Sequence, residues 1–182
     1  MMVWFSLALW VYTQTQSVLV LSIMSGIFLV VTAITSIWFG SLVDHHKKKT
    51  MMIISSAVSL ISFILAFIMY QTFPDEVFKN YQSVSLWIFI STTFIGVLAG
   101  NIRGIVLPTI TTILVDEENR DKANGMSGTV NGVVFLASSM ISGFLLAVSG
   151  MFWIFIGTIA VIIASIIHLY FLKIPEKGIV HI

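Results

Sequence analysis

A chain of 182 residues, of which 58% are hydrophobic and only 9% are charged, does not have the composition of a soluble domain. Soluble domains carry about a quarter charged residues, and a small domain leaves too much surface in water to hide so many apolar side chains. The mean hydropathy of +1.03 therefore indicates that lipid surrounds most of the chain. The net charge of +1 does not point to a nucleic-acid partner, and the absence of cysteine excludes disulfides and thiolate metal sites.

The first half of the chain predicts a partial helix followed by two membrane spans. Residues 1–13 are apolar, but the run is shorter than the ~20 residues that a spanning helix needs, and a polar stretch of threonine and glutamine closes it. Residues 17–40 and 50–70 are full uncharged spans with a charged block between them. The first helix is therefore expected to be incomplete.

The second half predicts three more spans. After the longest polar loop, residues 84–115 carry no charge except Arg103, and Pro108 is expected to kink the helix or to end its membrane part. A dense charged loop and then fifty uncharged residues follow. A single helix of that length would be ~75 Å long at 1.5 Å per residue, so the chain must turn back. We expect spans at 123–148 and 151–173, and overall an all-α, polytopic membrane protein with a single transmembrane lobe.

The distribution of basic residues predicts the orientation. Seven of the nine lysine and arginine residues fall in segments on one side of this threading, Lys79 falls on the other, and Arg103 lies within a span. Cytoplasmic loops collect lysine and arginine. We therefore expect a multi-pass protein of the cell (plasma) membrane, embedded in the lipid bilayer, with a cytoplasmic C-terminus.

A patterned motif lies at the cytoplasmic end of the span at 17–40. Its lysines alone could be a stop-transfer block that binds anionic headgroups. That interpretation does not explain an aspartate just before the lysines or a glycine four residues before the aspartate. A small residue lets helices approach closely, and a carboxylate can cap a neighbouring helix N-terminus. The residues of the motif are Gly40, Leu42, Asp44, Lys48 and Lys49.

This motif resembles the loop between helices two and three of the major facilitator superfamily, whose pattern is G-x-L-a-D-[RK]-x-G-[RK]-[RK]. The five residues match, whereas His45 replaces a basic residue and Lys47 replaces the second glycine. The resemblance implies the six-helix N-terminal lobe of the major facilitator fold. Because a full transporter of this family has twelve helices, the sequence is expected to be truncated at both ends, with a C-terminal six-helix lobe missing.

The charged loop before Ala123-Asn124-Gly125 and the end of the last span are similar to the drug- and macrolide-efflux branches of that family. The resemblance implies a secondary active transporter that expels small molecules and is coupled to an ion, with protons as a candidate. It also implies that Asp116, at the base of helix four, pairs with Lys48. Such a pair would latch two helix ends and bias one access state over the other.

Arg103 is the only charge within an apolar span, and Asn101 lies two residues before it. A charged side chain at the bilayer centre costs about 2.5–3.5 kcal/mol on insertion scales. In one interpretation the long side chain snorkels to the cytoplasmic interface. In the other, arginine and asparagine face a cavity, as resemblance to the antiporters of the family implies, and the arginine binds substrate or exchanges with a carboxylate. The sequence leaves both open.

Small residues recur in the span at 123–148, among them Gly128, Gly132 and Gly143. Because small side chains let membrane helices pack closely, these glycines predict a helix contact. Gly143 is also the one residue retained from the G-P-x-x-G-G ending that helix five carries in proton-coupled exporters of the family.

Enzymatic chemistry is not expected, because the sequence shows no nucleophile–base pair, metal-ligand cluster or phosphate-binding loop. No cofactor is expected either. Two interpretations compete with a transporter lobe. The chain could be a non-transporting membrane fragment or helper protein that packs against another membrane protein, or a half-size transporter that dimerises.

Overall fold

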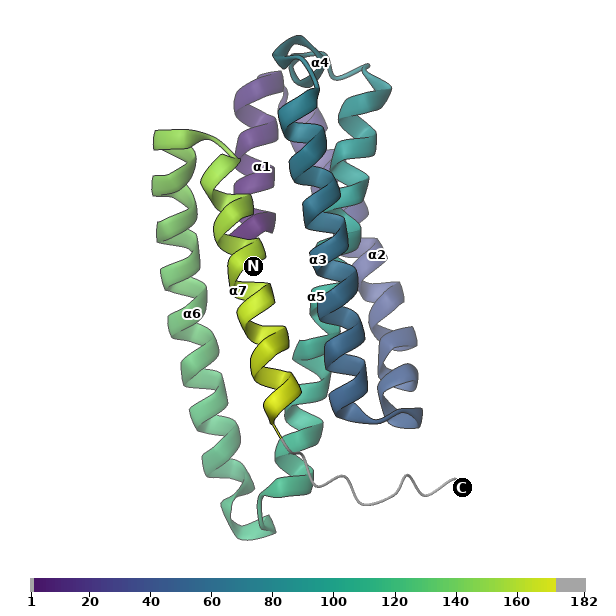
Figure 1. Cartoon of the computed structure of the whole chain (residues 1–182), viewed down its shortest axis with the longest axis vertical. Coiled ribbons are helices and arrows are strands. Elements are labelled where there is room, and N and C mark those ends of the chain that lie inside the picture. Colours follow the sequence, from purple (N-terminus) through teal and green to yellow (C-terminus); the bar gives the residue numbers. More distant parts are fainter. Residues whose placement is uncertain (1, 173–182) are drawn as a thin grey trace.

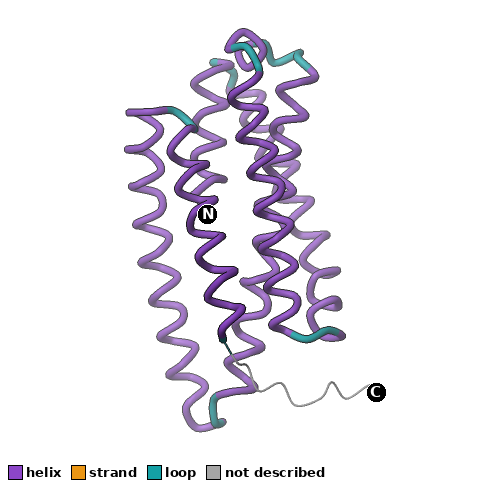
Figure 2. The backbone as a smooth tube through the Cα atoms, viewed as in Figure 1, coloured by secondary structure: helices purple, strands orange, loops and turns teal. Residues whose placement is uncertain are grey.

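A computed structural model describes residues 2–172, without the side chain of Ile113, as a bundle of helices (Figure 1). Figure 2 shows only helices and loops in this range. Five of these segments are long and apolar enough to cross a membrane, and the described elements are all helical, as the sequence predicted. The elements in chain order are α1 (Met2–Thr15), α2 (Val18–His45), α3 (Lys48–Thr72), α4 (Asp75–Lys79), α5 (Val84–Leu114), the 3-10 turn η1 (Glu117–Asn119), α6 (Arg120–Ser149) and α7 (Phe152–Phe171).

The described residues form seven α-helices rather than the six that we expected, because the loop after α3 contains the short helix α4. Pro74 precedes this helix, Asp75 and Glu76 lie in its first turn, and Lys79 lies in its last turn. Acidic residues at the start and a basic residue at the end complement the helix dipole. The same helix carries Phe78, whose side chain is only 1% exposed. The loop is therefore a packed element and not a free connection.

Pro108 does not end α5, contrary to one of the two outcomes that we expected. Proline lacks the N–H that would bind the carbonyl of Gly104 and its ring crowds that carbonyl. The helix nevertheless continues to Leu114, and the apolar span runs to Thr112. The hydroxyl of Thr112 donates to the carbonyl of Pro108 at 3.0 Å.

The first helix lies in the hydrophobic core of the bundle. Leu7 and Val11 are fully buried, and α1 contacts α2, α4, α5, α6 and α7. Trp10 of α1 also belongs to a group of interlocking rings that we call the aromatic cluster. Its ring centroid lies 5.0 Å from that of Phe78 in α4 and 5.5 Å from that of Phe89 in α5. The aromatic cluster consists of Trp10, Tyr70, Phe78, Phe89 and Phe155.

Helices α3 and α5 make the most extensive contact of the bundle. One face of α3 carries four buried serines, and the hydroxyl of Ser59 donates to the carbonyl of Gly96 in α5 at 2.8 Å. A Cβ atom added to Gly96 would lie 2.7 Å from the ring of Phe63. The two backbones approach closely because small residues meet there. The buried serines are Ser55, Ser56, Ser59 and Ser62.

The turn between α6 and α7 depends on Gly150. Its φ of +60° and ψ of −144° belong to a region that residues with a side chain rarely adopt. Its N–H closes α6 by donating to the carbonyl of Leu146 at 3.1 Å. An added Cβ atom would also lie 2.9 Å from the hydroxyl of Tyr70.

We therefore expect Gly150→Ala to lower the free energy of unfolding by about 1–3 kcal/mol, the cost of a strained backbone conformation. Unfolding of the purified protein in mixed micelles, titrated with SDS and followed by circular dichroism, would measure this. Gly157→Ala is the matched control, because a Cβ atom at this position in α7 would meet nothing within 4 Å. Equal losses in the two variants would contradict the prediction.

Candidate functional site

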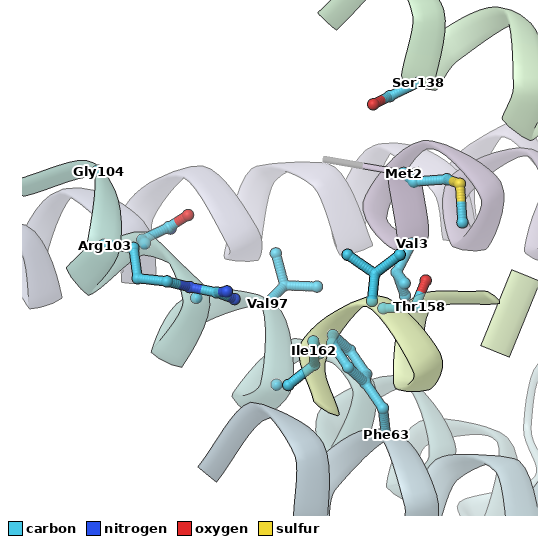
Figure 3. Close-up of a pocket in the computed structure, with 13 residues that line it drawn as sticks. Met2, Val3, Phe63, Val97, Arg103, Gly104, Ser138, Thr158 and Ile162 are labelled. Carbon is cyan, nitrogen blue, oxygen red and sulfur yellow. The ribbon is translucent and has the colours of Figure 1, made fainter. Parts of the chain in front are cut away.

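A cavity of about 470 Å³ lies among α1, α3, α5, α6 and α7 (Figure 3). Apolar side chains, including Val3 and Phe63, make up most of its wall. Two of the residues that the sequence singled out, Asn101 and Arg103, both line it from α5. Pockets of this size, mainly apolar with a few polar groups, are typical of small-molecule sites.

The side chain of Arg103 points away from the Leu114 end of α5. Helical side chains lean toward the N-terminus of their helix, and Nη2 of Arg103 lies 3.5 Å from the position of a Cβ atom on Gly100, one turn earlier. Figure 3 shows the guanidinium extending toward Val97. To snorkel to the interface at the Leu114 end, the side chain of Arg103 would have to point in the opposite direction. The structure therefore favours the cavity-facing interpretation.

The guanidinium of Arg103 has no protein partner among residues 2–172. Arg103 is half-buried, yet its side chain forms neither a hydrogen bond nor an ion pair with any of these residues. Asp and Glu residues of the described chain all lie at helix ends or in the connections between them. The cavity therefore contains a cation without a neighbouring carboxylate.

The cavity also contains two hydroxyl groups that no sequence pattern marks as cavity residues. Thr158 of α7 has a buried Oγ1 without a hydrogen-bond partner among the described residues, and Ser138 comes from α6 on the far side (Figure 3). Threonine and serine are common in membrane helices as packing residues. Only the fold distinguishes these two from the others.

The two lysines of the motif hold the C-terminal ends of two helices. Lys48 as a whole is 9% exposed, and its ammonium donates to the carbonyl of Val43 at 2.6 Å and to that of Asp44 at 3.3 Å at the end of α2. Lys49 donates to the carbonyls of Tyr170 and Leu172 at the end of α7. Cations stabilise the negative end of the helix dipole. The start of α3 thereby joins the ends of α2 and α7.

The other residues of the motif make few contacts within the described chain. Leu42 and Asp44 are exposed, and a Cβ atom on Gly40 would meet nothing within 4 Å. The N-cap residue of α3 is Lys47, and its side chain forms no capping hydrogen bond. Asp44 does not replace it as a cap. The turn to α3 also needs no glycine at Lys47, since its φ is −59°.

Asp116 lies at the N-cap of η1, after the end of α5. Figure 1 places η1 and the α2–α3 turn at the same end of the bundle, opposite α4. The hydrogen bonds described for Lys48 lead to the end of α2 and not to Asp116. Pairing of these two side chains therefore stays a prediction.

The sequence model of the Major Facilitator Superfamily matches residues 1–181, which is almost the whole chain. The chain belongs to the Major Facilitator Superfamily. Members of this family are membrane transporters. No curated protein and no solved structure matches the chain.

Among the described residues of this major facilitator protein, the glycines of α6 meet no neighbouring helix. A Cβ atom added to Gly128, Gly132 or Gly143 would meet nothing within 4 Å, and the first two positions are exposed. Helix α6 lies at the edge of the bundle and contacts mainly α1 (Figure 1). Small residues meet instead between α3 and α5, whereas α6 contacts α1 through the hydroxyl of Ser142, which donates to the carbonyl of Met2 at 3.2 Å.

The role of Lys48 in this major facilitator protein can be tested directly. We expect Lys48→Met to lower the free energy of unfolding by about 1.5–3 kcal/mol, the usual range for hydrogen bonds to a charged group. Methionine keeps most of the length of the side chain but cannot bind the carbonyls that end α2. Thermal unfolding in detergent would measure the loss. Lys47→Met, at an exposed position, is the control, and an equal loss there would refute the assignment.

Proposed function

We propose that this chain is one lobe of an ion-coupled transporter that expels small drug-like molecules across the cell membrane, with the cavity as its substrate site. The observation that carries the proposal is the place of Arg103 and Asn101 in that cavity. Arg103 lies 19 residues after the start of α5 and 11 before its end (103 − 84 and 114 − 103). Secondary transporters hold their substrates at a similar depth, near the middle of the bilayer.

The motif supports a gating role in the same proposal. Lys48 and Lys49 bring the ends of α2 and α7 to the start of α3. A rocking movement between two access states of the transporter would change these contacts. A carboxylate such as that of Asp116 would stabilise one of the two states by pairing with a lysine. Gly40, Leu42 and Asp44 are exposed or open on the same helix end, so they are available to a neighbouring element.

A second six-helix lobe is the partner that the proposal requires, because major facilitators work by rocking two lobes around a central site. The exposed apolar side chains of α6, such as Val130 and Val133, are consistent with such a neighbour. The basic segments on one side of the threading support a cytoplasmic position for the C-terminus. Similarity of the charged loop to drug and macrolide exporters supports the direction of transport.

Reconstitution into liposomes would test the proposal. We expect ionophore-sensitive movement of a dye when the chain is reconstituted together with a C-terminal six-helix lobe of the family, and we would use anionic, neutral and cationic dyes. Liposomes with either lobe alone and empty liposomes are the controls. If no dye moves under any of these conditions, the chain is better explained as a helper protein that packs against another membrane protein.

A further inference from the structure

We propose that the cavity binds an amphipathic organic anion, whose carboxylate pairs with Arg103 while its apolar body lies against Val3, Phe63 and Ile162. The inference rests on the proposed function, because it names the substrate class of the same cavity. It adds the charge of the ligand, which the family alone does not determine.

The first argument is the charge of the guanidinium. Arginine stays protonated in proteins, and a charge in apolar surroundings is costly unless an opposite charge pairs with it. The walls around Arg103 are mostly apolar, and none of the described acidic side chains lies in the cavity. No side chain within residues 2–172 supplies the counter-charge, and a bound anion would remove this cost.

The second argument is the space around the guanidinium. Three glycines, Gly96, Gly100 and Gly104, follow one another at four-residue spacing on α5, and all three line the cavity with Arg103. A Cβ atom on Gly104 would meet nothing within 4 Å, and one on Gly100 would touch Nη2 of Arg103 at 3.5 Å. The backbone therefore leaves room beside the guanidinium. Its planar fork can bind both oxygens of a carboxylate.

The third argument is the buried hydroxyl of Thr158. Its Oγ1 has no hydrogen-bond partner among the described residues, although nearly all buried polar atoms in proteins have one. Thr158 lies across the cavity from α5, next to Ile162 (Figure 3). A second polar atom of the ligand would satisfy this hydroxyl. The ligand is therefore anionic at one end, apolar along its body and able to form one further hydrogen bond.

A series of three ligands of nearly equal shape tests the charge preference. 2-Naphthoate is anionic, 2-naphthamide is neutral and 2-naphthylmethylammonium is cationic. Equilibrium dialysis against the full chain in phosphatidylcholine nanodiscs, corrected for empty nanodiscs, gives the three dissociation constants. We expect 2-naphthoate to bind about tenfold more tightly than the amide or better, and the ammonium compound to bind more weakly than the amide.

Variants connect this preference to the cavity. We expect Arg103→Gln to remove the difference between naphthoate and naphthamide, and Arg103→Lys to keep part of it, since lysine retains the charge but not the fork. Lys122→Gln removes an exposed positive charge outside the cavity and should leave the preference unchanged. Thr158→Val should leave the preference for 2-naphthoate unchanged but weaken the binding of 6-hydroxy-2-naphthoate, because only this compound has a second polar atom for the hydroxyl of Thr158.

Several results would overturn the inference. These are equal binding of the three ligands, no saturable binding of any of them, or a naphthoate preference that survives Arg103→Gln. Loss of the preference when a C-terminal lobe is added would show that a carboxylate side chain pairs with Arg103 instead. Because binding is measured without flux, each of these results is distinct from a failure of transport in liposomes.

Discussion

Replacement of Phe78 by alanine is expected to lower the free energy of unfolding by about 3–5 kcal/mol, the usual cost of truncating a buried phenylalanine. The side chain is 1% exposed, and its ring centroid lies 5.0 Å from that of Trp10 and 5.4 Å from that of Phe89. Helix α4 has only five residues, too few to be stable alone. Phe78 therefore holds both the aromatic cluster and the position of α4.

An SDS titration in mixed micelles, followed by tryptophan fluorescence, would measure the effect, because Trp10 lies in the aromatic cluster. Phe144→Ala is the control, since this side chain in α6 is 69% exposed. We expect the control to unfold at nearly the same SDS fraction as the original protein. A loss in Phe78→Ala no greater than in the control would show that α4 does not anchor the bundle.

Replacement of Gly96 by alanine is expected to lower the free energy of unfolding by about 1–3 kcal/mol, the range for overpacking a close contact. The added Cβ atom would lie 2.7 Å from the ring of Phe63, which is buried and also lines the cavity. Either the ring or the backbone of α3 must move. We therefore also expect weaker binding of 2-naphthoate, because the displaced ring would enter the cavity or change its shape.

Gly104→Ala is the matched control for Gly96→Ala, since it lies on the same helix and a Cβ atom there meets nothing within 4 Å. Alanine should be neutral or slightly stabilising at Gly104, because it is the better helix former. Thermal unfolding in detergent and dialysis with naphthoate would compare the two variants. Equal stability and equal naphthoate binding in the two variants would contradict the close approach of α3 and α5 at Gly96.

The sequence predicts five full spans, because apolar runs of spanning length are interrupted by short charged or polar segments, and five described helices are long and apolar enough to cross a membrane. The fifty uncharged residues from Ala123 to Leu172 could only be two helices, and the structure turns at Gly150. Helix α4 was missed because its five residues are mostly charged, which hides the one aromatic side chain that packs. The sequence does contain one indication of this helix: an aromatic residue, Phe78, lies among charged residues shortly after Pro74.

Packing between helices was harder to predict than the helices themselves. Glycines occur in both α5 and α6, and composition does not tell which helix turns its glycines toward a neighbour. The structure places Gly96 against Phe63 and leaves Gly128 and Gly132 open. Because lipid is as apolar as a helix partner, hydrophobicity does not distinguish the two surroundings. Only the three-dimensional arrangement does.

The candidate site was predictable in part. A lone arginine in an apolar span marks a candidate site, and the structure places Arg103 and Asn101 in one cavity. The direction of the arginine side chain needed the fold. Thr158 could not be found, because one threonine among many apolar residues of α7 has no distinguishing neighbour in sequence.

The serine-bearing face of α3 also has a consequence for biogenesis. Ser59 and Gly96, which share a hydrogen bond, are separated by only 37 residues. We expect α3 and α5 to enter the bilayer as a helical hairpin, because together they shield hydroxyl groups that each helix alone would present to hydrocarbon. This hairpin would be complete before the ribosome has synthesised α6 and α7, and would provide the surface on which those later helices assemble.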